Sequence, residues 1–183
     1  VHKHVALTAA LACLQRKAKP FTYLDTHAGA GAYALADRDD GTPGEWREGV
    51  GRLRVPGTAA GGPAAAEAPA EVQAYLGLVG EALTATGEYP GSPALARAML
   101  RPQDRAVLLE LHPAEATKLK SRFRGDRQVG VHAPRDAREG LRALLPSMTP
   151  RGLVLIDPSY ERRAEYAEVA GLLAVLRRHW AAA

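Results

Sequence analysis

"FTYLDTHAGAGAY", residues 21–33, joins a short apolar run to a turn that contains two glycines one residue apart. The run has the length and composition of a buried β-strand, and a strand that leads into such a turn is typical of cofactor-binding folds. Gly29 and Gly31 remove side chains where a ligand could touch the backbone, while Asp25 and His27 place polar groups on the rim. The stretch therefore predicts a cofactor loop, although the glycine pattern is weak when taken alone.

Three more apolar runs alternate with helical stretches along the chain. Strands are predicted within residues 106–113, 128–132 and 151–160, and helices over residues 5–16, 113–124, 136–145 and 161–179. Near-continuous apolar runs suit strands that are buried on both faces of a parallel sheet. The alternation predicts an α/β fold, a Rossmann-like parallel sheet with helices on both faces.

One interval is too long for a single crossover helix, because about 75 residues separate Gly31 from Ala106. It contains a Pro/Gly/Ala-rich stretch near residues 54–70, which predicts a flexible loop, and an amphipathic pattern over residues 71–87. Ser92 and Pro93 have the residue types of an N-cap and a first helical position. We therefore predict a small helical insertion over residues 38–98, after the first strand.

Composition restricts the class of protein. A chain of 183 residues, 46% of them hydrophobic, can bury one core. No apolar run approaches the roughly 18 residues of a membrane span, and the opening residues lead into a helical pattern rather than a signal peptide. Cys13 is the one cysteine, which excludes a disulfide framework and a multi-cysteine zinc site. We expect a single-domain cytoplasmic monomer with no metal and no membrane partner.

Positive charge is concentrated in the second half of the chain. Residues 1–92 carry 8 basic and 10 acidic side chains, whereas residues 93–183 carry 16 and 10. The densest basic run, residues 118–127, would suit a phosphate backbone as partner. A solvated helix face explains the same run equally well.

An acid stands at or just after the end of each predicted strand: Asp25, Glu110, Asp136 and Asp157. In open parallel sheets, ligands bind beyond the carboxyl ends of the strands. Each acid alone also fits a helix N-cap or a turn. The four together predict a binding site at this edge of the sheet.

The spacing argues against a dinucleotide, because Ala34 replaces the third glycine of that fingerprint. An acid before Gly-x-Gly, followed by an acid that ends the second strand, resembles class I S-adenosylmethionine-dependent methyltransferases. The resemblance implies that the backbone at Gly29 and Gly31 approaches the methionine part of the cofactor. It also implies that the Glu110 carboxylate accepts hydrogen bonds from the ribose hydroxyls.

"DPSY", residues 157–160, resembles the [Asp/Asn/Ser]-Pro-Pro-[Tyr/Phe/Trp] motif of enzymes that methylate amino groups of nucleobases. The Asp157 carboxylate and the Pro158 carbonyl would each accept one N–H of an adenine amino group. Tyr160 would stack on the extruded base. The second proline of the motif is Ser159 here, which leaves the backbone of Pro158 less restricted. An Asp-Pro turn that closes a strand is the alternative interpretation.

Five stretches in order carry a closer resemblance: residues 19–33, 44–53, 89–100, 110–113 and 150–161. Together they resemble the bacterial 23S ribosomal RNA adenine-N6 methyltransferases of the RlmJ type, along nearly the whole chain. The resemblance implies a class I methyltransferase domain over residues 1–183, S-adenosylmethionine as cofactor and one adenine of 23S ribosomal RNA as target.

Carried across by position, the cofactor contacts of that family fall on His4, His27, Ser92, Glu110, Asp136 and Asp157, with Lys3 beside His4. The resemblance implies a contact with the cofactor's adenine at Asp136 and Ala137, where this chain departs from the Asp-Gly of the family. Relative to the family, we expect the chain to be incomplete at both ends. Two alternatives remain open, a DNA adenine-N6 methyltransferase and a non-catalytic RNA-binding module.

Overall fold

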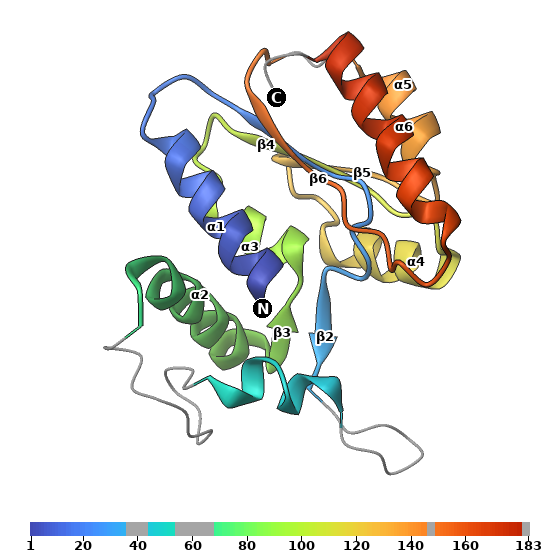
Figure 1. The fold of residues 1–183 in the computed structure, drawn as a ribbon. Helices are drawn as coiled ribbons and strands as arrows, with labels where there is room; N and C mark the ends of the chain where they lie inside the picture. Colours follow the sequence, from blue (N-terminus) through green and yellow to red (C-terminus); the bar gives the residue numbers. More distant parts are fainter. Residues whose placement is uncertain (36–43, 54–67, 146–148, 181–183) are drawn as a thin grey trace.

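The computed structural model describes residues 1–35, 44–53, 68–145 and 149–180 (Figure 1). Its central sheet has four parallel strands in the order β5-β4-β1-β6. The strands are β1 (Thr22–Asp25), β4 (Arg105–Leu109), β5 (Val129–His132) and β6 (Gly152–Leu155). Because β1 lies between β4 and β6, Asp25 is in register with Leu108 on one side and Leu155 on the other. The predicted α/β class and the four strands are confirmed.

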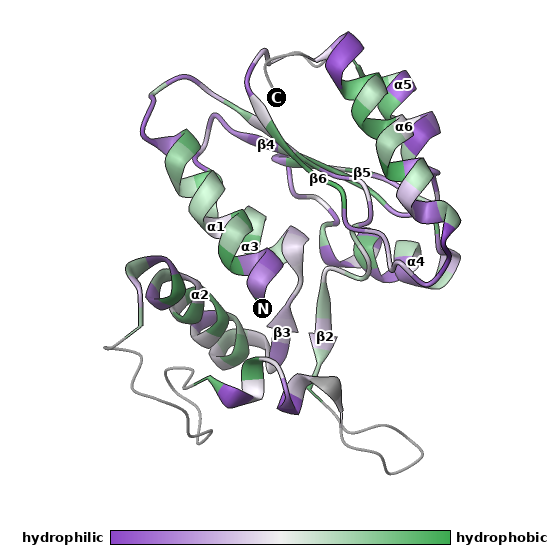
Figure 2. Cartoon of the chain, in the orientation of Figure 1, coloured by the Kyte–Doolittle hydropathy of each residue, from purple (hydrophilic) through white to green (hydrophobic). Residues whose placement is uncertain are grey.

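Helices cover both faces of the sheet, as predicted. Side chains alternate across each strand, so Tyr23 enters one core and Leu24 enters the other. The first face carries α1 (His2–Gln15), α3 (Ser92–Met99) and α4 (Pro113–Arg122), and the second carries α5 (Ala137–Leu144) and α6 (Ala164–His179). Figure 2 shows hydrophobic strands between these two layers.

A second unit lies between β1 and β4. Strand β2 (Ala32–Ala34) pairs antiparallel with β3 (Glu88–Pro90), and α2 (Ala70–Thr86) packs beside them with two short 3-10 helices, Glu45–Arg47 and Val50–Arg52. Tyr75, Leu76 and Val79 of α2 form the centre of its core. The β2-β3 pair was not predicted, because runs of three residues carry no readable alternation. Of the predicted flexible loop near 54–70, residues 54–67 lie outside the described residues.

Helix α3 belongs to both units. Leu95 packs in the core around α2, whereas Ala96 packs in the core between the sheet and α1. This helix therefore fixes the insertion against the sheet, and the boundary at residue 98 stays a prediction. Within the described residues, no helix is long and apolar enough to cross a lipid bilayer.

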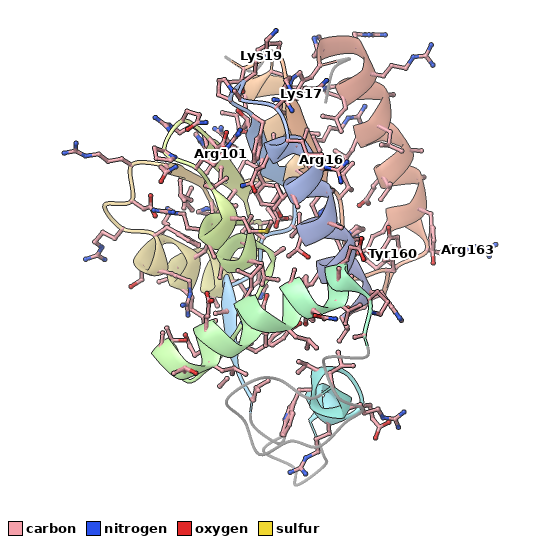
Figure 3. The ribbon with its side chains drawn as sticks, turned by 90° about the vertical axis from the view of Figure 1, so that its left-hand side faces the viewer. Arg16, Lys17, Lys19, Arg101, Tyr160 and Arg163 are labelled. Carbon is pink, nitrogen blue, oxygen red and sulfur yellow. The ribbon has the colours of Figure 1, made fainter. Side chains whose placement is uncertain are left out.

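An ion pair between a partly exposed arginine and a buried acid joins the amino ends of the strands to the turn after α1. The Asp104 side chain is fully buried and accepts hydrogen bonds from Phe21 N at 3.2 Å and from Arg101 Nε at 2.7 Å. Arg101 also donates to the carbonyls of Lys17 and Lys19 in the turn after α1, where Figure 3 shows these residues close together. Burial raises the pKa of Asp104, but the hydrogen bonds from Arg101 and from two backbone N–H groups outweigh it, so the net pKa is lowered.

Replacing Asp104 should destabilise the fold far more than replacing an exposed acid. Asp104→Ala removes the counterion of Arg101 and leaves Phe21 N without its acceptor, so we expect a loss of about 3 kcal/mol in the free energy of unfolding. The control is Glu115→Ala, which breaks the exposed Lys118–Glu115 pair and should cost less than about 1 kcal/mol. Urea unfolding at neutral pH measures both, and equal losses would contradict the role of the buried pair.

The same pair gives a pH dependence. Because the pKa of Asp104 is lowered in the folded protein, its stabilisation is fully present above the ordinary value of 3.8 and is lost as the pH falls through the folded pKa. The difference in unfolding free energy between the wild type and Asp104→Ala should therefore be constant near neutrality and shrink in acid.

Candidate functional site

The glycine turn after β1 bends over the end of β4. Ala28 N donates to the carbonyl of Leu109 at 2.9 Å, and Gly29 N donates to Glu110 Oε2 at 2.7 Å. Gly29 and Gly31 have φ angles of 60° and 86°, in the left-handed region that glycine adopts without strain. A Cβ on Gly29 would also lie 2.1 Å from the hydroxyl of Tyr33. The turn therefore depends on both glycines.

Glu110 follows β4 and is half-buried. Its Oε2 accepts from Gly29 N and its Oε1 accepts from His112 N, each at 2.7 Å. A carboxylate oxygen has two lone pairs, so each oxygen can accept one more hydrogen bond. The two backbone donors hold the carboxylate in one orientation beside the turn, where it can accept from the two hydroxyls of a ribose.

Asp25 lies beneath the turn rather than on its rim. The prediction placed it at the rim, but its side chain is fully buried. Tyr23 Oη and Ser92 Oγ each donate to Asp25 Oδ2 at 2.7 Å, and His27 N donates to Oδ1 at 3.1 Å. Burial raises the pKa of Asp25, and these donors oppose the rise. Asp25 therefore supports the turn from below.

Ser92 has a different local role from the one predicted. Helix α3 begins at Ser92 with Gly91 as its N-cap, so the predicted N-cap role of Ser92 is wrong. Its hydroxyl donates to Asp25 instead, and its side chain is buried. Gly91 N donates to the carbonyl of Gly31 at 2.9 Å, which brings the start of α3 against the glycine turn. A direct contact of Ser92 with a cofactor stays a prediction.

The start of α1 reaches the site through Lys3. Lys3 Nζ forms an ion pair with Asp157 Oδ2, and both side chains are partly exposed. The first turn of α1 and the segment after β6, which are far apart in the sequence, therefore meet at this ion pair.

His4 faces away from this ion pair, toward the insertion. Its Nδ1 lies 2.9 Å from Tyr89 Oη, which lies 2.8 Å from Tyr75 Oη. Burial, reinforced by the charge of Lys3, lowers the pKa of His4 to about 4, so the ring is neutral at neutral pH. His4 is buried, with 5% of the residue exposed, and a contact between it and a cofactor remains a prediction.

Four other predicted residues line one cavity. His27, Asp136, Ala137 and Pro158 line a space of about 510 Å³ that α6 closes on the opposite side. Asp136 also caps α5, accepting from Arg138 N at 2.9 Å and Glu139 N at 3.1 Å, so the N-cap interpretation is confirmed. The cavity therefore joins the glycine turn, the start of α5 and the segment after β6.

The residues of the segment after β6 differ in their exposure to solvent. Asp157 is half-buried, Pro158 is buried, and Ser159 and Tyr160 are exposed. Tyr160 has a φ angle of 57°, a left-handed conformation that costs a non-glycine residue about 1–3 kcal/mol. The hydroxyl of Ser159 lies 3.5 Å from Glu165 Oε1, a long contact. Strain of this kind is frequent where a backbone is held for binding or catalysis.

Sequence reasoning missed several tyrosines around the site. Tyr33 covers the glycine turn, Tyr89 and Tyr75 contact His4, and Tyr166 lies with its ring centroid 5.0 Å from that of Tyr160. Tyr33 and Tyr89 face each other in the β2-β3 pair, which is too short to predict. Tyr166 lies inside a predicted helix, where the sequence does not reveal which ring it meets.

Comparisons with known proteins agree with this geometry. A sequence-family model described as "Ribosomal RNA large subunit methyltransferase D, RlmJ" matches residues 18–183. Two curated relatives are both described as "Ribosomal RNA large subunit methyltransferase J". The one from Escherichia coli K12 is 40% identical over 176 residues, covering 94% of this chain and 59% of the relative. The one from Haemophilus influenzae is 38% identical over 170 residues, covering 91% and 57%.

A crystal structure of a protein from Legionella pneumophila strain Philadelphia 1 matches with a TM-score of 0.76 and 33% identity, over 98% of this chain and 63% of that one. The likeness confirms the Rossmann-like methyltransferase fold. The chain spans about three fifths of the length of the curated relatives that it matches. Because the family match and both relatives extend along nearly all of it, the chain belongs to the RlmJ family of ribosomal RNA large subunit methyltransferases.

Proposed function

We propose that this chain transfers a methyl group from S-adenosylmethionine to N6 of an adenine in 23S ribosomal RNA. One observation carries the proposal: a glycine turn braced by Glu110 and the Asp157–Tyr160 segment lie at the same edge of the sheet, after β1, β4 and β6. The turn offers backbone and a carboxylate to a cofactor, and the segment offers two acceptors and a ring to a base. The names of both relatives support the same reaction class.

The residues present fit S-adenosylmethionine. A Cβ on Gly31 would lie 3.1–3.3 Å from side chains of α4 and from Phe123, so only glycine leaves the turn compact enough for a close approach. The oriented Glu110 carboxylate would accept from the ribose hydroxyls, and Asp136 and Ala137 would border the adenine of the cofactor. When bound, the cofactor supplies an electrophilic methyl group. Lys3, His4, His27, Ser92 and Asp157 would complete its surroundings.

The acceptor side must hold a poor nucleophile, because the lone pair of an adenine amino group is delocalised into the ring. The Asp157 carboxylate and the Pro158 carbonyl would each accept one N–H and aim the nitrogen at the methyl group. The ion pair with Lys3 leaves acceptor positions on Asp157, since a carboxylate has about four of them. Tyr160 would stack on the extruded base.

Basic side chains without acidic partners would bind the RNA backbone. Within the basic run 118–127, Lys118 pairs with Glu115 and Arg122 pairs with Glu88, so these two cations already have acidic partners. Among the described residues, Lys120 and Arg124 of the same run form no ion pair. A second basic group, Arg16, Lys17 and Lys19, projects from the turn after α1 (Figure 3). These groups suit phosphates, which fix orientation without reading sequence.

The deciding experiment is transfer of labelled methyl from S-adenosylmethionine to unmodified 23S ribosomal RNA, with adenine-containing DNA in parallel. N6-methyladenosine in the RNA supports the proposal. Methylation of DNA alone would favour the DNA enzyme. Binding of RNA without binding of S-adenosylmethionine would favour a non-catalytic RNA-binding module.

Glu110→Ala should weaken S-adenosylmethionine binding by about 10- to 100-fold, because charge-assisted bonds to two hydroxyls and the brace on Gly29 are lost together. Glu110→Gln, which keeps one acceptor oxygen, should lose less. Isothermal titration calorimetry measures the dissociation constants, with Glu115→Ala as the control at a neighbouring acid. If Glu110→Ala binds as the wild type does, the ribose role is wrong.

Asp157→Ala should reduce methyl transfer by at least about 100-fold while changing the affinity for S-adenosylmethionine by less than about tenfold. Turnover should fall much more than cofactor affinity because the Asp157 carboxylate is proposed to orient the adenine amino group. Labelled-methyl transfer under saturating cofactor gives the turnover, and Glu81→Gln, a loss of charge on the exposed face of α2, is the control. Turnover close to that of the wild type in Asp157→Ala would contradict the mechanism.

A further inference from the structure

Two tyrosines form an exposed aromatic pair beside the Asp157–Tyr160 segment. Tyr160 ends that segment, and Tyr166 lies in the first turn of α6. Their ring centroids are 5.0 Å apart at an interplanar angle of 45°. Tyr160 is 42% exposed and Tyr166 is 63% exposed, the largest exposed fraction among the large hydrophobic side chains of the described residues. The mechanism uses Tyr160 and leaves Tyr166 unexplained.

The two rings are too close to hold a base between them. A centroid distance of 5.0 Å is within the range of about 4.5–7 Å for rings in direct contact. Each ring nevertheless keeps exposed surface, so one base can stack on Tyr160 while another stacks on Tyr166. Two contacting rings with separate free surfaces suit two different nucleotides.

Charge at the same place points to a nucleic acid rather than to an apolar partner. Arg162 pairs with Glu165 and Glu168 of α6. Its neighbour Arg163 is exposed and, within the described residues, forms no ion pair. Figure 3 shows Arg163 and Tyr160 at the same edge of the molecule. A guanidinium beside exposed rings is the combination that binds single-stranded nucleic acid, through phosphate and through stacking.

We propose that Tyr166 stacks on the base of a nucleotide adjacent to the target adenine, and that Arg163 binds a phosphate of the same single-stranded segment. The proposal rests on the proposed function and extends it from one base to its neighbour. An extruded base leaves its neighbours without a stacking partner, and Tyr166 supplies one. In this arrangement Tyr160 contacts the target and Tyr166 contacts the flanking nucleotide.

A comparison of two ligands tests this assignment. Adenosine 5′-monophosphate can reach only the target position, whereas a single-stranded RNA pentanucleotide with a central adenine also supplies neighbours. Tyr166→Ala should weaken pentanucleotide binding by about 5- to 100-fold, the range expected for loss of one base stack, and leave monophosphate binding within about twofold. Tyr166→Phe, which keeps the ring, should bind both ligands like the wild type. Calorimetry with S-adenosylmethionine present measures each dissociation constant.

Two further variants provide a control for Tyr166 and a test of the phosphate contact of Arg163. The control, Leu173→Ala, removes another exposed apolar side chain of α6 and should change the dissociation constant of neither ligand. Arg163→Ala should lower the salt dependence of pentanucleotide binding, with a change of about 0.7 in the slope of log K against log salt concentration.

Failure of the inference and failure of the proposed function give different results. Equal losses for both ligands in Tyr166→Ala would mean that Tyr166 acts only by holding Tyr160, and would overturn the proposal. No loss for either ligand would overturn it as well. If the wild type itself binds cofactor but neither ligand, the proposed function fails, and the inference fails with it.

Discussion

The site depends on one hydrogen bond, from Gly29 N to Glu110 Oε2. It joins the turn after β1 to the residue that follows β4. Two backbone hydrogen bonds support it, from Ala28 N to the carbonyl of Leu109 and from Arg135 N to the carbonyl of Glu110. Glu110 therefore holds the glycine turn through its carboxylate and the segment that leads to α5 through its backbone carbonyl. Because β1 lies between β4 and β6, the carboxyl ends of these three strands lie next to one another at one edge of the sheet.

Beneath that bond, the buried carboxylate of Asp25 holds three parts of the chain in position. A fully buried carboxylate is costly unless its oxygens are satisfied, and three donors from three parts of the chain satisfy them. Tyr23 lies on the same strand, His27 lies in the turn, and Ser92 starts α3. The position of the insertion is therefore coupled to the glycine turn through one carboxylate.

Sequence reasoning was most successful where a structure is encoded locally. Apolar runs predicted the four strands, and each predicted acid lies at or after the carboxyl end of one of them. It failed where a role depends on a distant partner. The Ser92 hydroxyl donates to Asp25, 67 positions earlier in the chain, and this contact cannot be read from either local stretch. The role of Arg101 is hidden in the same way, because it binds carbonyls after α1 that lie more than 80 positions earlier in the chain. Three-residue strands such as β2 and β3 are too short to show a pattern.

The two sides of the site differ in how firmly they are held. The side proposed to bind the cofactor is built around the fully buried Asp25 and the half-buried Glu110, whose carboxylates accept hydrogen bonds of 2.7–3.1 Å. The acceptor side has a strained Tyr160, a long contact at Ser159 and two exposed rings. Under the proposed function, preorganisation suits the small cofactor, whereas a single-stranded RNA segment has to be accommodated as it leaves its own stack. Ser159, which replaces the second Pro of the motif, leaves the backbone freer on the side that is proposed to meet the RNA.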